Sequence, residues 1–232
     1  MATVPSLYIV AGPIGNLKDI TLRALETLQA VEAVLCEDTR HTGRLMQAHG
    51  IKRRLISCHA HNQQRAAERA LELLNEGFDL AYLSDAGTPG VSDPGARLVA
   101  VVRAAGHPVI PIPGASALTA LLSVSSFGGK TMVFEGFLPR KRGKRSKRLR
   151  ELLEAPDQGQ QVVLYESPHR IIAVLEEIVE IDPGRPVLLG REMTKLHEEY
   201  LEGSALEVLE LLRAKNSLKG ECSLLVSAAK KH

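Results

Sequence analysis

Hydrophobic positions recur along the chain in two patterns: short apolar runs, and longer stretches with apolar residues three to four positions apart. The runs are typical of buried strands, and the stretches are typical of amphipathic helices. In the first half, strands are expected at 7–11, 33–36, 54–57, 80–83 and 109–112. Helices are expected between and after them at 20–30, 41–49, 62–75, 94–105 and 117–124. This alternation predicts an α/β fold with a mostly parallel sheet.

A glycine- and serine-rich stretch at 125–129 divides the chain into two predicted domains, 1–125 and 130–232. The second domain has its own pattern. Its expected strands are 131–135, 161–165, 186–190 and 222–227, and its expected helices are 146–153, 168–180 and 205–214. We find no internal repeat. Both domains are therefore predicted to be of the α/β class.

Glycine-rich segments follow three of the expected strands. They are AGPIGN at 11–16, SDAGTPGVSDPG at 84–95 and PGAS at 113–116. Glycine allows the backbone to approach a ligand closely, and such loops at the carboxyl ends of strands predict a small-molecule site. The first segment is neither a Walker A loop nor a dinucleotide fingerprint, because Gly12 and Gly15 are three positions apart. One Rossmann-like feature remains: Glu37 and Asp38 lie about 20 residues after this segment, where a dinucleotide-binding protein has its ribose-binding acid.

Composition sets limits on the class of protein. Apolar residues make up 44% of 232 residues, enough for a packed core, and no apolar stretch is long enough to span a membrane. The N-terminus lacks the pattern of a signal peptide, so a cytoplasmic location is expected. Cys36, Cys58 and Cys222 form no CxxC pair and favour buried, reduced thiols over reactive ones. His59 and His61 match no standard zinc spacing, and no metal is expected.

Positive charge is concentrated in one segment, RKRGKRSKRLR at 140–150. It holds eight basic residues and no acid, so the remainder of the chain is at −6 while the whole chain is at +2. A dense basic segment on an otherwise mildly acidic chain predicts contact with a polyanion. A solvated loop or a charged helix start is the structural alternative. Because no aromatic residue lies in the segment, the pattern favours contact with phosphates over base stacking.

Further polar clusters lie at the ends of expected strands. Glu37, Asp38 and Arg40 follow the second strand, and a helix cap is as good an interpretation of them as a substrate-orienting group. YESPHR at 165–170 reads as a cap with Ser167 and Pro168 at the helix start, which leaves its Glu, His and Arg unexplained. The segments REMTKLHEE at 191–199 and LKGE at 218–221 also read as a charged edge and a simple turn.

Taken in order, these motifs match one family. AGPIGNLKDIT, CEDTR, SDAGTPGVSDPG, PGASA, GFLPRK, YESPHR, LGREMTKLHEE and KGE resemble the small-subunit ribosomal RNA methyltransferase I family, over about residues 5–227. That family belongs to the tetrapyrrole-methylase-like class of enzymes that use S-adenosylmethionine (SAM). The resemblance implies two α/β domains with SAM in the cleft between them, and a homodimer. It implies methylation of the ribose 2′-oxygen of a cytidine near the decoding centre of 16S rRNA, with 16S rRNA or the small ribosomal subunit as the partner.

The resemblance also implies site residues. The cofactor would contact Ala11, Gly12, Pro13, Gly15, Asp85, Gly87, Thr88, Ala115, Ser116, Tyr165, Glu166, Met193, Leu218 and Gly220. Candidates for proton removal and substrate orientation are Glu37, Asp38, Arg40, Glu192 and Lys195. Candidates for RNA contact are Arg140, Lys141, Arg142, Lys144, Arg145 and Lys147. Members of the family often extend beyond the point that corresponds to His232, and we expect any RNA-binding role of that extension to be absent here or to fall to the basic segment.

Three other functions stay open from the sequence. The first is a tetrapyrrole C-methyltransferase acting on a porphyrinogen or precorrin, which uses the same scaffold but has less need of the basic segment. The second is a non-catalytic ribosome-assembly factor that binds SAM without turnover. The third is a nucleotide-binding Rossmann protein, which would prefer NAD or ATP to SAM.

Overall fold

The computed structural model describes residues 4–91, 95–154, 160–215 and 217–227. The chain divides into two units, Met1–Ser116 and Ala117–His232. This division falls before the predicted interval between residues 125 and 130, because the helix α5 (Ala117–Ser123) packs with strands of the second unit. The predicted domain boundaries themselves stay a prediction.

The first unit contains a sheet of five parallel strands in the order β3-β2-β4-β1-β5. The strands agree with the sequence prediction except that the first ends one residue earlier. Their bounds are β1 (Leu7–Val10), β2 (Ala33–Cys36), β3 (Arg54–Ser57), β4 (Leu80–Leu83) and β5 (Val109–Ile112). β2 and β4 are buried along their whole length, as expected for strands covered on both faces.

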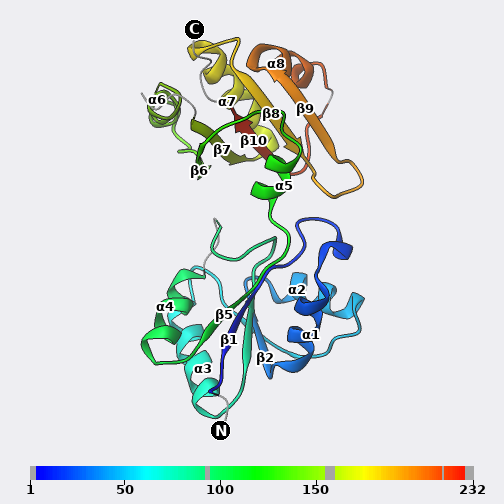
Figure 1. Cartoon of the computed structure of the whole chain (residues 1–232), viewed down its shortest axis with the longest axis vertical. Coiled ribbons are helices and arrows are strands. Elements are labelled where there is room, and N and C mark those ends of the chain that lie inside the picture. The colour runs from blue at the N-terminus through cyan, green and yellow to red at the C-terminus, as the bar shows by residue number, and fades with distance from the viewer. Residues whose placement is uncertain (1–3, 92–94, 155–159, 216, 228–232) are drawn as a thin grey trace. The chain divides into compact units, whose positions relative to one another are not determined.

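Two helices cover each face of this sheet. α1 (Leu22–Ala30) and α2 (Thr39–Ala48) pack on one face, and α3 (Gln63–Asn75) and α4 (Ala96–Ala104) pack on the other (Figure 1). Alternate strand residues take part in the two cores: Leu35 packs with α3 and α4, and Val34 packs with α1 and α2. A short 3-10 helix, η1 (Leu17–Asp19), precedes α1.

The order of strands places the two long glycine-rich loops side by side. β1 and β4 are neighbours in the sheet, but the chain leaves β1 toward α1 on one face and leaves β4 toward α4 on the other. Neighbouring parallel strands whose connections diverge in this way form a topological switch point, which is where open α/β sheets bind their ligands. The segments 11–16 and 84–95 begin at this point, although residues 92–94 lie outside the described ranges.

The second unit contains a mixed sheet in the order β6-β7-β10-β8-β9. Only β6 and β7 are parallel, and the other neighbouring pairs are antiparallel. β9 is absent from the sequence prediction. The strands are β6 (Thr131–Phe137), β7 (Gln160–Glu166), β8 (Pro186–Arg191), β9 (Glu199–Ser204) and β10 (Cys222–Val226).

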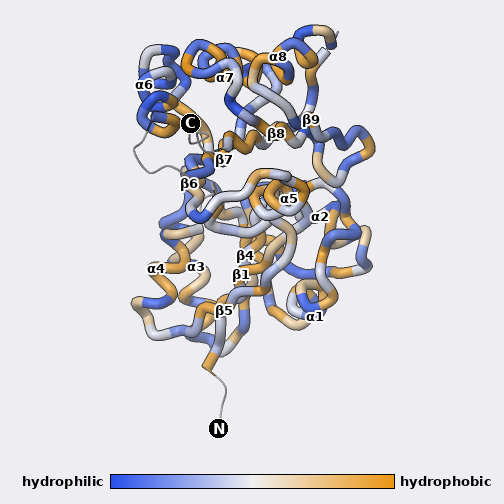
Figure 2. Tube along the Cα trace, turned by 45° about the horizontal axis from the view of Figure 1, so that its top comes forward, coloured by the Kyte–Doolittle hydropathy of each residue, from blue (hydrophilic) through white to orange (hydrophobic). Residues whose placement is uncertain are grey.

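Three helices build the main core of the second unit on one face of its sheet. They are α6 (Arg142–Leu153), α7 (Pro168–Ile181) and α8 (Ala205–Arg213). α5 lies on the opposite face (Figure 1). There the Leu121 side chain fills the space beside Gly190. The central strands of both sheets are largely apolar, whereas α6 is mostly hydrophilic (Figure 2). In the described part of the chain, no helix has the length and apolar character needed to cross a membrane.

Candidate functional site

The loops at the carboxyl ends of the first sheet are joined by hydrogen bonds between backbone groups. The amide of Gly12 donates to the carbonyl of Gly87 at 2.9 Å, and the amide of Gly87 donates to the carbonyl of Pro13 at 3.2 Å. The hydroxyl of Thr88 donates to the carbonyl of Ala115 at 3.0 Å. The structure therefore brings together predicted cofactor residues from three separate loops, after β1, β4 and β5.

Gly87 has to be glycine in this arrangement. Its φ is +74°, and a Cβ atom there would lie 3.0 Å from the Ile14 side chain and 3.3 Å from the Ala115 carbonyl oxygen. A left-handed backbone and close approach of a second chain segment are the two conditions that require glycine. The contact fixes the second glycine-rich loop against the first.

Acidic groups lie beside these loops, at the ends of β2 and β4. The carboxylate of Asp85 accepts from the amide of Asp38 at 3.1 Å, and the carboxylate of Glu37 accepts from the amide of Asp85 at 3.4 Å. Three carboxylates therefore lie at one edge of the sheet. Such groups suit a ligand that carries positive charge and ribose hydroxyls.

Asp38 serves as a helix cap as well as a member of this cluster. Its carboxylate accepts from the amides of Arg40 and His41 at the start of α2, and it pairs with the Arg40 guanidinium at 3.0 Å. The hydrogen bonds from Arg40 lower the pKa of the Asp38 carboxyl to about 2. A carboxylate with so low a pKa is a weak proton acceptor, so this residue is better suited to orient a ligand than to act as a base.

A second group of predicted residues lies at one end of the strands of the second sheet, where β7 and β8 end and β10 begins. β10 is antiparallel to both β7 and β8, and Cys222 at its start is opposite Glu166 and Arg191 at their ends. The segments 165–166, 192–195 and 218–221 therefore meet at this end. The predicted residues Tyr165, Met193 and Gly220 come together here as a result.

Glu192 and Lys195 form a network with the turn before β10. The Lys195 ammonium donates to the Glu192 carboxylate at 2.8 Å and to the Glu221 carboxylate at 2.9 Å. The Glu192 carboxylate also accepts from the Glu221 amide at 3.0 Å. Glu192 and Thr194 both have positive φ, 50° and 65°, so this turn is held in a conformation that L residues rarely adopt.

The pKa values of this network argue against a proton-accepting role. Burial alone would raise the pKa of Glu192, but the hydrogen bonds from Lys195 and from the Glu221 amide outweigh burial and lower it. Burial likewise would lower the pKa of Lys195, and its two carboxylate partners raise it instead. Both groups are therefore charged at neutral pH, and both are better suited to hold the turn than to remove a proton.

Comparison with known proteins identifies the family. Residues 6–209 match the family model of tetrapyrrole (corrin/porphyrin) methylases. The chain is 44% identical to the ribosomal RNA small subunit methyltransferase I of Borrelia garinii subsp. bavariensis, over 95% of this chain and 98% of that protein. It is 45% identical to the protein of the same name from Escherichia coli O157:H7, over 97% of this chain and 78% of that protein. This chain belongs to the ribosomal RNA small subunit methyltransferase I family.

Solved structures of the wider tetrapyrrole methylase class have the same fold. A cobalt precorrin-4 methyltransferase aligns with a TM-score of 0.69 at 16% identity, over 95% of this chain and 94% of that one. The uroporphyrin-III C-methyltransferase of Thermus thermophilus, solved with S-adenosyl homocysteine, aligns with a TM-score of 0.64 at 19% identity, over 95% and 96%. The predicted two-domain α/β fold of this class is confirmed. At such low identity the likeness concerns the fold alone.

Within this family fold, the YESPHR motif has a structural role that the sequence left unexplained. The Glu166 carboxylate is buried, accepts from the Ser167 amide at 2.8 Å and pairs with Arg170 at 3.0 Å. Arg170 in turn donates to the carbonyls of Leu138 and Pro139. Ser167 is the N-cap residue of α7 by position, but its side chain makes no capping hydrogen bond. Glu166 and Arg170 therefore hold the chain between β6 and α6.

The basic segment forms a longer helix than predicted. α6 begins at Arg142 rather than near residue 146, because acidic side chains of neighbouring elements pair with its cations. Arg148 pairs with Glu135 at 2.7 Å, and Arg142 pairs with Glu180 at 3.1 Å. These pairs remove the mutual repulsion that would otherwise oppose a helix with so many positive charges.

Arg145 has to be withdrawn from the candidates for RNA contact. Its guanidinium makes two hydrogen bonds to the Glu177 carboxylate, at 2.7 and 3.1 Å, and its side chain is only 9% exposed. A buried, paired guanidinium has no surface to offer a phosphate. The other candidates are exposed, namely Arg140, Lys141, Arg142, Lys144 and Lys147.

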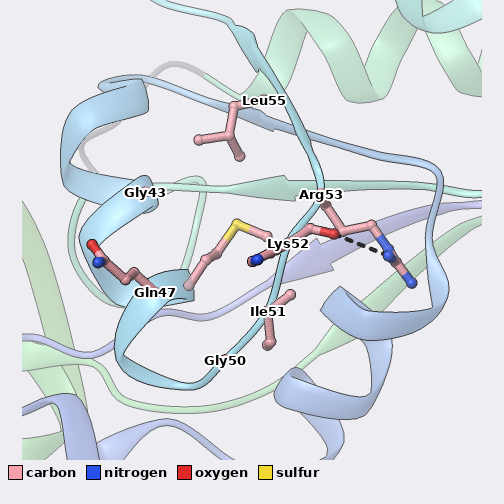
Figure 3. Close-up of a pocket in the computed structure, with 8 residues that line it drawn as sticks. Gly43, Gln47, Gly50, Ile51, Lys52, Arg53 and Leu55 are labelled. Carbon is pink, nitrogen blue, oxygen red and sulfur yellow. Dashed lines mark hydrogen bonds between the residues drawn. The ribbon is translucent and has the colours of Figure 1, made fainter.

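A cavity of about 400 Å³ lies elsewhere in the first unit, between the end of α2 and the start of β3 (Figure 3). Met46, Ile51 and Leu55 form its apolar lining, and Arg53 donates to the carbonyl of Lys52 at its rim. Because Ile51 and Lys52 precede β3, the cavity is at the amino ends of the parallel strands. It is therefore remote from the glycine-rich loops and is not part of the candidate site.

The three cysteines are free and buried, as interpreted from the sequence. Burial raises the pKa of the Cys58 and Cys222 thiols to about 11, so both are protonated and unreactive at neutral pH. Within the described residues, no group of three or more His, Cys, Asp or Glu side chains is arranged to hold a metal ion.

Proposed function

We propose that this protein transfers a methyl group from SAM to the ribose 2′-oxygen of a cytidine near the decoding centre of 16S rRNA. The observation that carries the proposal is the 44% identity to a ribosomal RNA small subunit methyltransferase I over nearly the full length of both chains. Homology of this extent covers every motif on which the resemblance rests. The partner is 16S rRNA or the small ribosomal subunit that contains it, and the resemblance further predicts a homodimer in the cytoplasm.

The residues at the carboxyl ends of the strands of the first sheet fit this cofactor. SAM supplies an electrophilic methyl group on a sulfonium, which passes to a nucleophile by direct in-line displacement. The carboxylates of Glu37, Asp38 and Asp85 suit its positive charge and its ribose hydroxyls. The loops at 11–15 and 84–88 are joined by the hydrogen bonds between Gly12, Gly87 and Pro13, so their backbone groups are held together where one ligand can contact both loops.

Catalysis by this chain would rest mainly on position. Holding the 2′-oxygen in line with the methyl group can supply roughly 7–11 kcal/mol of barrier reduction. We propose that the exposed Arg40 guanidinium, which pairs with Asp38 at the start of α2, holds a phosphate of the substrate. The pKa values of Asp38, Glu192 and Lys195 disfavour a role in removing a proton. These charged groups therefore serve to orient loops and ligands.

The test is methyl transfer from labelled SAM to small ribosomal subunits from a strain that lacks this enzyme. We expect label at the 2′-oxygen of a single cytidine near the decoding centre. A porphyrinogen serves as the competing acceptor in a parallel assay. Methylation of the porphyrinogen alone would overturn the proposal in favour of a tetrapyrrole C-methyltransferase, and tight SAM binding without any transfer would favour a non-catalytic assembly factor.

The exposed cations of the basic segment should dominate the affinity for rRNA. Replacing Arg140, Lys141, Lys144 and Lys147 by glutamine is expected to weaken subunit binding and to leave SAM affinity unchanged. The slope of log K against log salt should fall by about 0.7–0.9 for each phosphate that the variant no longer neutralises. The matched control replaces four exposed cations elsewhere, namely Arg23, Lys52, Arg103 and Arg213. Equal binding by wild type and the segment variant would contradict this prediction.

A further inference from the structure

An exposed aromatic ring stands immediately before the basic segment. Phe137, the last residue of β6, is 59% exposed although it is a large apolar side chain. Its ring packs edge-on against Tyr165, with ring centroids 6.1 Å apart, and Phe134 packs against the same tyrosine at 4.9 Å. The chain holds only eight phenylalanine and tyrosine residues and no tryptophan. Three of the eight are gathered at this point.

A β-bulge in β6 creates this cluster. Phe134 is paired with Val163 and Phe137 with Tyr165, so three residues of β6 advance while β7 advances two. Without the bulge, residues 134 and 137 would point to opposite faces of the sheet, because side chains alternate along a strand. The extra residue, Glu135, turns to α6 and pairs with Arg148. The bulge thereby aims both phenylalanines at the face that α6, α7 and α8 leave uncovered.

The backbone that follows Phe137 is held by two buried or half-buried arginines. Arg170 donates to the carbonyls of Leu138 and Pro139, at 2.9 and 3.3 Å, and Arg145 donates to the carbonyl of Arg140 at 3.4 Å. Leu138 itself is buried in the core. The backbone next to the exposed ring is therefore held in place. This reduces the conformational entropy that would be lost when a ligand binds to the ring.

Two exposed cations follow this ring on the same short piece of chain. Arg140 and Lys141 are exposed and lie three and four residues after Phe137. An aromatic ring beside positive charge is the combination that binds single-stranded nucleic acid, since the ring stacks on a base and the cations attract the phosphates. The exposed Phe78 provides the contrast: its neighbours Glu76 and Asp79 are acidic.

We propose that Phe137, supported by Tyr165, stacks on an unpaired base of the rRNA substrate while Arg140 and Lys141 contact the adjacent phosphates. The inference rests on the proposed function. It assigns a base-reading residue to a protein whose basic segment, taken alone, predicts phosphate contact only. Unpaired bases are the targets because bases within an RNA helix are already stacked and offer no free face.

The test compares variants of Phe137 in methyl transfer to unmethylated small ribosomal subunits. Phe137→Leu keeps the apolar surface and removes the ring, and it should raise the KM for subunits roughly 5- to 150-fold, the loss expected for one stacked base. KM for SAM should not change. Phe137→Tyr and Phe137→Trp restore a ring and should return the KM for subunits to near the wild-type value. Phe78→Leu is the matched control on an exposed phenylalanine and should have no effect.

The salt dependence separates stacking from charge. Phe137→Leu should lower affinity without changing the slope of log K against log salt, whereas Arg140→Gln or Lys141→Gln should lower that slope. An unchanged KM for subunits in Phe137→Leu would overturn the inference while the proposed function stands. A raised KM for SAM would also overturn it, because the ring would then belong to the cofactor site. If wild type methylates no rRNA, the proposed function and this inference both fail.

Discussion

Replacing Glu177 by glutamine is expected to lower the free energy of unfolding by about 3–5 kcal/mol. The Glu177 side chain is 3% exposed and makes two hydrogen bonds to the guanidinium of Arg145, which is buried beside it. Glutamine fills the same space but has no charge. The guanidinium would then be a buried cation without a counter-ion, which is among the most destabilising changes that a single substitution can make. Denaturant unfolding at neutral pH measures the effect.

The neighbouring turn of α7 offers a matched control. Glu180 pairs with Arg142 at 3.1 Å, but both side chains are largely exposed. Glu180→Gln removes the same charge from the same helix and should cost at most about 1 kcal/mol, because water solvates the unpaired partner. The double variant Arg145→Met with Glu177→Leu replaces the buried pair by apolar groups and should recover most of the lost stability. Equal losses for Glu177→Gln and Glu180→Gln would contradict this account.

The buried pair also explains why a helix so rich in arginine belongs to the folded core. Arg145 joins α6 to α7, and Leu149 of α6 is buried in the core of the second unit. Arg148 joins α6 to the bulge of β6. Part of the basic segment is thus structural, and the remaining cations form the exposed surface. Charge density along the sequence overstates the charge that is available to a polyanion.

Most of the architecture was predictable because its signals are local. The parallel strands of the first unit other than β3 are apolar runs, and glycine-rich loops or helix caps end them. Thr21 and Asp38 cap α1 and α2, as a threonine and an aspartate before an amphipathic helix suggest. The loops after β1, β4 and β5 could be assigned to one edge, because parallel strands place their carboxyl ends together.

The remainder depended on contacts between distant residues. β9 was missed because Glu199–Ser204 reads as a charged turn, and its strand is stabilised by pairing with β8 and by the ion pair of Glu199 with Arg191. The bulge in β6 cannot be read from the alternation of apolar residues, since it depends on the register with β7. The burial of Arg145 required Glu177, which lies 32 residues further along the chain.

The turn at Gly220 depends both on a local sequence signal and on a contact with a residue that is distant in the sequence. Its glycine is visible in the sequence, but the reason for it is the Glu192 carboxyl group, which comes from a different strand end. Gly220 has a φ of +95°, and a Cβ atom added there would collide with that carboxyl group. The carboxyl group has little freedom to move, since it accepts from Lys195 and from the Glu221 amide.

Gly220→Ala is therefore expected to damage the site far more than its size suggests. The backbone alone should cost about 1–2 kcal/mol, the penalty for a left-handed residue with a side chain. Displacing the Glu192 carboxylate adds the loss of two charge-assisted hydrogen bonds. If the turn carries the proposed contacts of residues 218–220 with SAM, a shift of about 1 Å should reduce methyl transfer by on the order of 100-fold.

A glycine with the same backbone conformation separates these contributions. Gly77 has a φ of +98°, and nothing lies within 4 Å of the position of its missing Cβ. Gly77→Ala should therefore lower the free energy of unfolding only by the cost of the left-handed backbone, and it should leave methyl transfer intact. The double variant Gly220→Ala with Glu192→Ala removes the collision, so its loss of stability should be smaller than the sum of the two single losses. Strict additivity would mean that Gly220 is required only for its positive φ, and that the collision with Glu192 contributes nothing to the loss of stability.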